Sequence, residues 1–351
     1  MEYSKSVKIW LSIGLVMVFI QVIVGGITRL TESGLSITKW NVVSGTFPPT
    51  NDESWVREFN LYKDTPQYKE INEGMSLSDF KFIYFWEYVH RFWARVMGFV
   101  FLIPFLYFLK KKMIDPPLLK KLGIVIFLAL LAAAFGWIMV ASGLVERPWV
   151  NAYKLSIHLI IAFSVYAALL WALFSAYKST TIENDVGILL IRPLILLFIL
   201  FCVQVFLGGI LSGMKAAVIY PTWPDMNGCY LPSILMDIKE WSSENFYNYD
   251  RNGFMPALIH FLHRNTAYVV FLTGCWLAYK LYYLGRMGFP LLKRTSVVLI
   301  FSLLFQVFIG IITVINSKGS IPILWGVLHQ VGALLILSTL VFLFFVIRIK
   351  K

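Results

Sequence analysis

Long apolar runs separated by short polar connections place this chain in a membrane. Only 14% of its residues are charged and the mean hydropathy is +0.72, whereas soluble domains have about 25% charged residues. A helix needs about 20 apolar residues to span a bilayer. Such runs lie near 8–27, 82–109, 119–141, 152–177, 189–212, 256–283, 294–316 and 322–347. The sequence therefore predicts an all-α membrane protein with eight transmembrane helices.

The placement of charge predicts how the chain is oriented. Its net charge is +12, but the basic residues gather in the short connections after the second and sixth runs and at the two ends, which does not indicate nucleic-acid binding. By the positive-inside rule, both termini are cytoplasmic. The two long loops then lie on the outer side. We expect a multi-pass protein of a bacterial inner (plasma) membrane, because no transit peptide precedes the first run.

The second half of the chain repeats the first. Segment 21–27 reads Gln-Val-Ile-Val-Gly-Gly-Ile, and segment 204–210 reads Gln-Val-Phe-Leu-Gly-Gly-Ile. Further matches are Trp40 with Trp223, Gly45 with Gly228, Pro49 with Pro232, Gly136 with Gly310, and His90-Arg91 with His263-Arg264. We therefore expect two pseudo-symmetric four-helix bundles related by an axis along the membrane normal. They are 1–180 with outer loop 28–79, and 186–351 with outer loop 213–255.

Four of the five histidines lie at a similar depth on different predicted helices. They are His90, His158, His263 and His329, on the order of 10–15 Å below the outer interface at 1.5 Å per residue. A single histidine in a membrane helix is more often a satisfied helix contact, but four in duplicated positions favour metal ligation. A zinc site usually gathers three or four ligands, whereas imidazole pairs suit heme iron. We predict two bis-histidine sites, one in each half.

Glu87 and His260 occupy the same position in the two halves, one turn before His90 and His263. A carboxylate this deep in a membrane is costly and indicates function, although an ion pair with Arg91 would also explain it. Because the repeat partner of Glu87 is a histidine and not an acid, we favour the functional interpretation. One site would then perform chemistry while the other carries electrons.

Cations flank these histidines. Arg91, Arg95, Lys154 and Arg264 are candidates to pair with heme propionates through charge-assisted hydrogen bonds. Solvated or snorkelling side chains explain each of them equally well.

Several segments resemble heme A synthase. They are Gly-Gly-Ile-Thr-Arg-Leu-Thr-Glu-Ser-Gly-Leu-Ser-Ile at 25–37, Lys39-Trp40, Gly45 with Pro48-Pro49, and Phe80-Lys81-Phe82-Ile83 followed by Glu87-Tyr88-Val89-His90-Arg91. The resemblance extends over nearly the whole chain. Some members of that family carry a cysteine pair in an outer loop. This chain has no cysteine in 28–79 and only Cys229 in 213–255, so we do not expect electrons to enter through thiols.

The resemblance implies an enzyme that oxidises a methyl group of heme O to a formyl group by successive hydroxylations, giving heme A for cytochrome oxidase. It implies that His263 and His329 ligate a heme b cofactor, and that His90 and His158 hold the substrate heme O. Glu87 would lie beside the reacting methyl group, as a base or as a stabiliser of positive charge.

Two other classes use the same ligands. One is a di-heme b-type cytochrome that exchanges electrons with quinol, and the other is a non-catalytic heme-handling protein of oxidase assembly. The difference between Glu87 and His260 favours the enzyme, because an electron carrier gives no reason for one buried acid. The expected partners are heme O, an unidentified electron acceptor, heme O synthase and oxidase assembly factors.

Overall fold

The computed structural model describes residues 3–39, 47–144, 148–177, 182 and 184–347. Within these ranges the regular elements are helices, apart from one isolated bridge between Met226 and Cys229. The chain divides into two compact units, with the boundary between Leu169 and Leu170. The all-helical class predicted from the sequence is confirmed.

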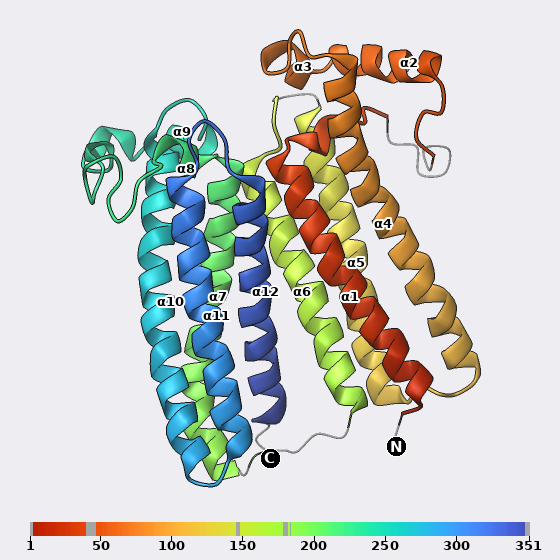
Figure 1. The fold of residues 1–351 in the computed structure, drawn as a ribbon, viewed down its shortest axis with the longest axis vertical. Coiled ribbons are helices and arrows are strands. Elements are labelled where there is room, and N and C mark those ends of the chain that lie inside the picture. The colour runs from red at the N-terminus through yellow and green to blue at the C-terminus, as the bar shows by residue number, and fades with distance from the viewer. Residues whose placement is uncertain (1–2, 40–46, 145–147, 178–181, 183, 348–351) are drawn as a thin grey trace. The chain divides into compact units, whose positions relative to one another are not determined.

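The first unit contains four long helices and a small outer cover (Figure 1). The long helices are α1 (Lys5–Leu30), α4 (Leu77–Lys110), α5 (Pro116–Gly143) and α6 (Ala152–Ala176), the last of which crosses the unit boundary. The cover is formed by α2 (Asp52–Lys63) and α3 (Pro66–Glu70), and the 3₁₀ turn η1 (Ser33–Leu35) packs against α1, α4 and α5.

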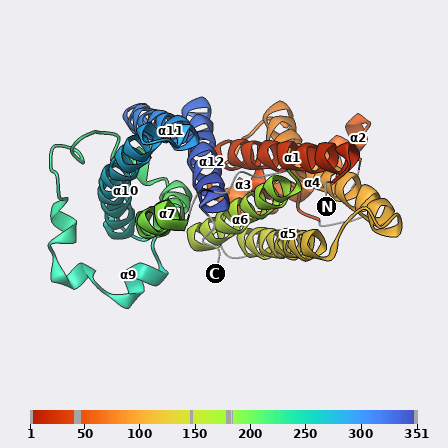
Figure 2. The ribbon, with the colours of Figure 1, turned by 90° about the horizontal axis from the view of Figure 1, so that it is seen from below.

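The second unit also has four long helices, α7 (Asn184–Gly213), α10 (Phe254–Arg286), α11 (Pro290–Ile315) and α12 (Ile323–Val346). Figure 2 shows them end-on, with α10 beside both α7 and α11, against which it makes its main contacts. Short elements lie between α7 and α10: α8 (Ala216–Ile219), η3 (Ser233–Leu235), η4 (Ile238–Glu240) and α9 (Ser243–Tyr247).

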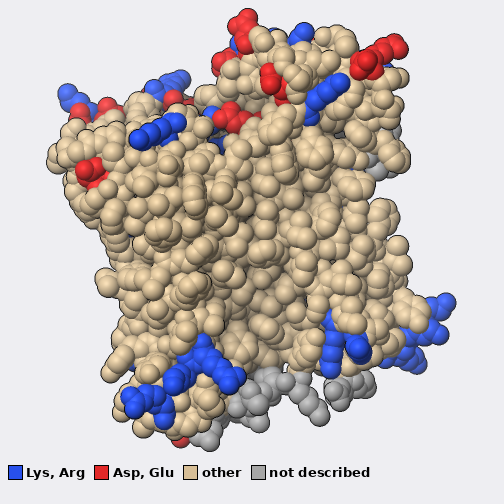
Figure 3. Space-filling model, viewed as in Figure 1, with Lys and Arg blue, Asp and Glu red and all other residues tan. Residues whose placement is uncertain are grey.

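Local sequence signals set the ends of these helices. Ser76 caps α4 through a capping box with Asp79, and Asp115 caps α5 immediately before Pro116. These side chains accept hydrogen bonds from main-chain N–H groups that have no partner within the helix. One end of the molecule carries Lys and Arg with almost no acidic residues, whereas the acidic residues lie near the other end together with further Lys and Arg (Figure 3).

Seven of the described helices are long and apolar enough to cross a membrane: α1, α4, α5, α6, α7, α11 and α12. The helix α10, which covers the predicted sixth run at 256–283, has 33 residues but is not among them. Its apolar character is diluted by polar residues, including His260 and Arg264, which are only 2% and 6% exposed. Both side chains are buried by the second unit. The mean hydropathy of α10 is therefore lowered by residues that contact the protein and not its surroundings.

Aromatic side chains and indole hydrogen bonds join α1 to α4. Trp10 packs on Phe101 at a ring-centroid distance of 4.8 Å, and its indole N–H donates to the carbonyl oxygen of Val100. The indole N–H of Trp93 donates to the carbonyl oxygen of Met17 at 2.9 Å. These bonds satisfy both indoles inside an apolar bundle and fix the register between α1 and α4.

The close approach of α10 to α11 depends on Gly285. A Cβ at this position would lie 2.5 Å from the main-chain nitrogen of Lys293 and 2.8 Å from its Cα. We expect Gly285→Ala to lower the free energy of unfolding by about 1–3 kcal/mol, because main-chain atoms of α11 must move. Thermal unfolding of the detergent-solubilised protein measures this change.

The matched control is Gly98→Ala on α4, where a Cβ would meet no atom within 4 Å. Helix propensity alone then predicts equal stability or a gain of up to about 1 kcal/mol. Equal stabilities for the two variants would contradict tight packing at Gly285.

Candidate functional site

The second unit brings two of the predicted ligands together. His263 on α10 and His329 on α12 face each other with ring centroids 6.4 Å apart and ring planes inclined by 69°. An imidazole nitrogen binds a metal at about 2 Å, and its ring centre lies roughly 1 Å further away. Two imidazoles that share one metal therefore have centres up to about 6 Å apart. The observed spacing would let His263 and His329 hold one metal between them.

The first unit contains the other two histidines, His90 on α4 and His158 on α6. Both rings are partly exposed, as are those of His263 and His329. Within the described residues, no group of three or more His, Cys, Asp or Glu side chains is arranged to hold a metal ion.

Each of the four histidines packs against a glycine of a neighbouring helix. The pairs are Gly25 with His90, Gly136 with His158, Gly208 with His263, and Gly310 with His329. A Cβ on these glycines would lie 3.2, 3.2, 3.0 and 2.8 Å from the nearest ring atom. Such distances are at or below van der Waals contact. Each ring therefore occupies space that a side chain on the glycine would fill.

Glutamines contact the histidines of the second unit. The side-chain amide nitrogen of Gln204 on α7 lies 3.2 Å from Nε2 of His263, and that of Gln306 on α11 lies 3.3 Å from Nε2 of His329. The Nδ1 atoms of both rings are buried and make no hydrogen bond of normal geometry, and the same holds for His158. These rings therefore retain bonding capacity on their ring nitrogens.

Glu87 is 2% exposed and its carboxylate is held by four donors. Its Oε2 accepts from the Ser36 N–H at 2.7 Å, the Ser36 hydroxyl at 2.6 Å and the Ile37 N–H at 2.8 Å. Its Oε1 pairs with the guanidinium of Arg91, one turn further along α4. The ion pair considered from the sequence is thus present, together with a main-chain clamp that the sequence did not reveal.

His260, the counterpart of Glu87, is equally buried at 2% exposure. Its ring lies 6.2 Å from that of Tyr220, and its Nδ1 has no hydrogen-bond partner. The two units therefore place different chemistry at this position: an ion-paired acid in one and an imidazole in the other.

The predicted propionate contacts differ in their surroundings. Arg264 donates to the carbonyl oxygens of Pro224 and Tyr230, both at 2.8 Å, and so ties the outer segment to α10. Arg91 is bound to Glu87. Arg95 and Lys154 are partly exposed, on α4 and at the start of α6.

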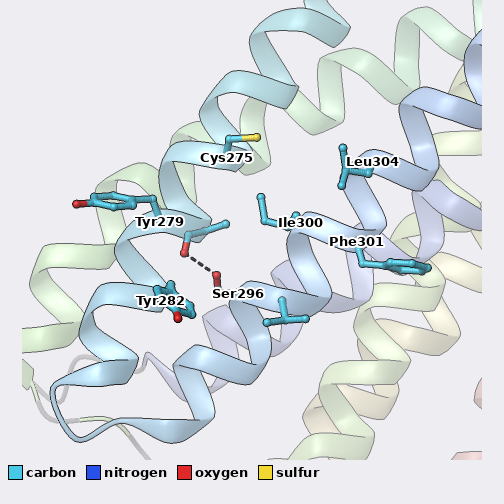
Figure 4. Close-up of a pocket in the computed structure, with 9 residues that line it drawn as sticks. Cys275, Tyr279, Tyr282, Ser296, Ile300, Phe301 and Leu304 are labelled. Carbon is cyan, nitrogen blue, oxygen red and sulfur yellow. Dashed lines mark hydrogen bonds between the residues drawn. The ribbon is translucent and has the colours of Figure 1, made fainter.

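A groove of about 500 Å³ between α10 and α11 lies outside this set of residues (Figure 4). Its lining is largely apolar and includes Cys275, Tyr279 and Phe301, and the Ser296 hydroxyl donates to the carbonyl oxygen of Ala278 at 2.6 Å. None of the predicted site residues lines it. All three cysteines of the chain are free thiols.

The family of cytochrome oxidase assembly proteins matches the chain over residues 8–341. The chain belongs to this family. Heme A synthase of Pelagibacter ubique is 38% identical over 347 residues, covering 96% of this chain and 95% of its own length. Those of Nitrosospira multiformis and Flavobacterium psychrophilum are each 37% identical and cover 95% and 97% of this chain, and 91% and 97% of their own lengths. The resemblance to heme A synthase noted in the sequence is confirmed.

Sequence reasoning missed Ser36, Gln204 and Gln306. A signal for Gln204 was present, since Gln21 and Gln204 begin the repeated segments. Ser36 lies within segment 25–37 of the resemblance, but its contact with Glu87 arises from the fold of 31–37. The matched residues Trp40 and Gly45 lie outside the described part of the chain.

The cover holds the segment that clamps Glu87. Gln67 donates to the carbonyl oxygen of Glu32 at 3.0 Å, and Tyr62 on α2 donates to the side chain of Gln67 at 3.0 Å. Burial raises the pKa of Tyr62 to about 12. The cover therefore depends on a neutral phenol.

We expect the stabilisation from neutral Tyr62 to be complete below pH 10 and to be lost as the pH rises through about 12. The measurement is a spectrophotometric titration of tyrosinate in the wild-type protein and in Tyr62→Phe. The difference between the two absorbance curves reports the ionisation of Tyr62. A difference that titrates near pH 10, the ordinary value for tyrosine, would show that the phenol is not buried.

Proposed function

We propose that this membrane protein is a heme A synthase, which oxidises a methyl group of heme O to a formyl group by successive hydroxylations. The observation that carries the proposal is the close approach of His263 and His329, 6.4 Å between ring centroids, in a chain related over nearly its whole length to proteins named heme A synthase. That activity requires residues that bind heme, and a pair of histidines can do so.

The resident cofactor is a heme b in the second unit, held by His263 and His329. Its fit is supported by the ring spacing, by the unpartnered Nδ1 atoms and by the glycines that accept each ring. When bound, this heme supplies one-electron transfer. The protein's own part would be to hold both imidazoles in place, through the glycines that each ring contacts.

The substrate heme O is held in the first unit by His90 and His158. The same glycine contacts support this assignment, because Gly25 and Gly136 give both rings the setting found in the second unit. Arg91, Arg95 and Lys154 are the candidates for its propionates, and Arg264 is the candidate for those of heme b.

Glu87 is the proposed catalytic residue. Both of its oxygens already accept hydrogen bonds, from four donors in all. Its role is therefore to stabilise positive charge that develops near the reacting methyl group and to orient the substrate, with Arg91 and Ser36 fixing its position. Of the two roles inferred from the resemblance, this one suits the observed clamp better than proton abstraction does.

The membrane arrangement follows from the helices and the charges. We propose that α10 is an eighth span, because its polar groups are buried in the second unit. Two four-helix bundles, 1–180 and 186–351, then form a parallel repeat. Both termini face the cytoplasm of a bacterial inner (plasma) membrane. Heme O synthase and oxidase assembly factors are the proposed protein partners.

A di-heme electron carrier is the second candidate, favoured by the fact that both units offer the same glycine-histidine setting. Expression in a host that makes heme O but no heme A, followed by heme extraction and chromatography, separates the two. Appearance of heme A or its hydroxylated precursor supports the enzyme. Unchanged heme O together with two bound b-type hemes would favour the carrier.

Glu87→Gln is expected to keep heme bound while lowering product formation on the order of a hundredfold, because it removes one negative charge from the site. Heme content by absorbance and product by chromatography are measured on the same preparation. Wild-type product yield from this variant would exclude a catalytic role for Glu87.

His263→Ala is expected to abolish tight heme b binding, because it removes one axial ligand. His260→Ala, three residues away on the same helix, serves as the control and is expected to retain the heme. Heme content and the ferric low-spin spectrum distinguish the two variants. Loss of heme from His260→Ala with retention in His263→Ala would move the ligand to His260.

A further inference from the structure

The groove between α10 and α11 is lined by one stripe of side chains from each helix. Successive members of a stripe are three or four residues apart, which places them on one face of the helix. They are Cys275, Tyr279 and Tyr282 on α10, and Val297, Ile300 and Leu304 on α11. Tyr279 and Phe301 stand on the two sides of the groove and are 68% and 69% exposed (Figure 4). The groove is therefore open to whatever surrounds these two helices.

The floor of the groove is formed by small side chains. Ala278 and Ser296 line it and are buried, where α10 and α11 lie against each other. The Ser296 hydroxyl donates to the carbonyl oxygen of Ala278, so this pair of polar groups is already satisfied. The volume of about 500 Å³ is that of a small-molecule site. An occupant of this groove would therefore be mainly apolar.

Each stripe continues into a cation at the connection between the two helices, 287–289. Arg286 lies four residues after Tyr282 on α10, and Lys293 lies four residues before Val297 on α11. A spacing of four keeps each cation on the face that lines the groove. Both cations are exposed, and Nζ of Lys293 lies 5.7 Å from the centre of the Tyr282 ring. One end of the groove therefore carries two positive charges.

Negative charge is scarce around these cations. Residues 251–351 contain no Asp or Glu. Among the described acidic residues of the second unit, Asp185 lies at the start of α7 and the others lie between α7 and α10, in the outer segment. No carboxylate of the described residues forms an ion pair with Arg286 or Lys293. The charged end of the groove is therefore suited to an anion.

The length of the groove matches half of a bilayer. Eleven positions separate Lys293 from Leu304 on α11, and the same number separates Arg286 from Cys275 on α10. At 1.5 Å per residue this is roughly 16 Å. The hydrocarbon core of a membrane is about 30 Å thick, so one leaflet contributes about 15 Å. One lipid tail would therefore extend from the two cations to the far end of the groove.

We propose that this groove binds an anionic phospholipid of the cytoplasmic leaflet, with an acyl chain between α10 and α11 and the phosphate at Arg286 and Lys293. Lys and Arg at the cytoplasmic ends of membrane helices attract anionic headgroups. Here they stand at the end of an apolar groove of matching length. The inference rests on the proposed membrane arrangement, in which both helices span and their connection is cytoplasmic. It does not depend on the proposed reaction.

The test titrates the purified full chain in detergent with phosphatidylglycerol or with phosphatidylcholine of the same acyl chains. Native mass spectrometry measures the apparent dissociation constant of each lipid. We expect phosphatidylglycerol to bind at least about fivefold more tightly, because each Lys or Arg close to an anionic headgroup contributes about that factor. Equal affinities for the two lipids would overturn the proposal.

Arg286→Gln and Lys293→Gln are each expected to weaken binding of phosphatidylglycerol about fivefold and to leave that of phosphatidylcholine unchanged. Arg294→Gln is the matched control. Arg294 is exposed and adjacent to Lys293, but it points about 100° away around the helix. It removes the same charge, and its effect should stay within about twofold because the charge is distant from the groove. An equal loss in Arg294→Gln would indicate a diffuse attraction and refute a defined site.

A second pair of variants fills the groove or leaves it open. Val297 and Val298 are 59% and 53% exposed, and of the two Val297 lines the groove. Val297→Trp is expected to weaken phosphatidylglycerol binding about tenfold, because the acyl chain can no longer be buried. Val298→Trp should bind as wild type does. Equal affinities of the two variants would overturn the groove as the binding site.

Thermal unfolding of each variant shows whether its fold is kept. If Val297→Trp does not fold, Val297→Phe takes its place with the same expected direction. The mass spectra also report a competing occupant. A dimer without lipid in the wild type, converted to a monomer by Val297→Trp, would assign the groove to a second copy of this chain and refute the lipid site.

The membrane arrangement is tested separately with Met287→Cys in a Cys229→Ser background. Met287 is 63% exposed beside Arg286, and Cys229 is the exposed native thiol of the outer segment. A membrane-impermeant maleimide should label this variant in inside-out vesicles and not in intact cells. Labelling of intact cells would refute the cytoplasmic leaflet as the source of the lipid, whatever the affinity in detergent. Lipid binding as expected in a chain that makes no heme A would refute the enzyme alone.

Discussion

The contact between a glycine backbone and an imidazole is the constraint on which both units depend. At Gly310 a Cβ would lie 2.8 Å from the His329 ring, and the three equivalent glycines are nearly as close. A side chain there would push the ring away, and with it the helix that carries the histidine. Because protein interiors do not yield easily, the position of each imidazole is fixed by helix packing.

The approach of His263 to His329 could be predicted from sequence because both residues lie on long helices of regular geometry. Depth follows from a rise of 1.5 Å per residue, so the sequence predicts one level for His90, His158, His263 and His329. The repeat supplied the pairing. The contact between His263 and His329 then follows from two helices of one bundle facing the same core.

Other features could not be predicted, for identifiable reasons. The clamp on Glu87 depends on segment 31–37 folding back over α4 so that Ser36 presents both its N–H and its hydroxyl, and no periodic pattern specifies such a turn. The amide contacts of Gln204 and Gln306 depend on helix rotation and on a rotamer choice. The hydropathy of α10 is lowered by polar residues such as His260 and Arg264. Whether such residues are buried by neighbouring elements cannot be read from hydropathy, because burial depends on the fold.

The two units share the glycine-histidine contact but differ in the side chains beside it. Four helix pairs supply the same glycine and histidine, whereas Glu87 stands where the second unit has His260, and Ala132 stands where it has Gln306. An acid held by Arg91 and Ser36 gives the first unit a fixed negative group one turn from its histidine. In the second unit the same position carries an imidazole that is 2% exposed and has no ion-pair partner among the described residues. Substitution of single side chains on a shared helical frame therefore changes the chemistry beside each histidine pair.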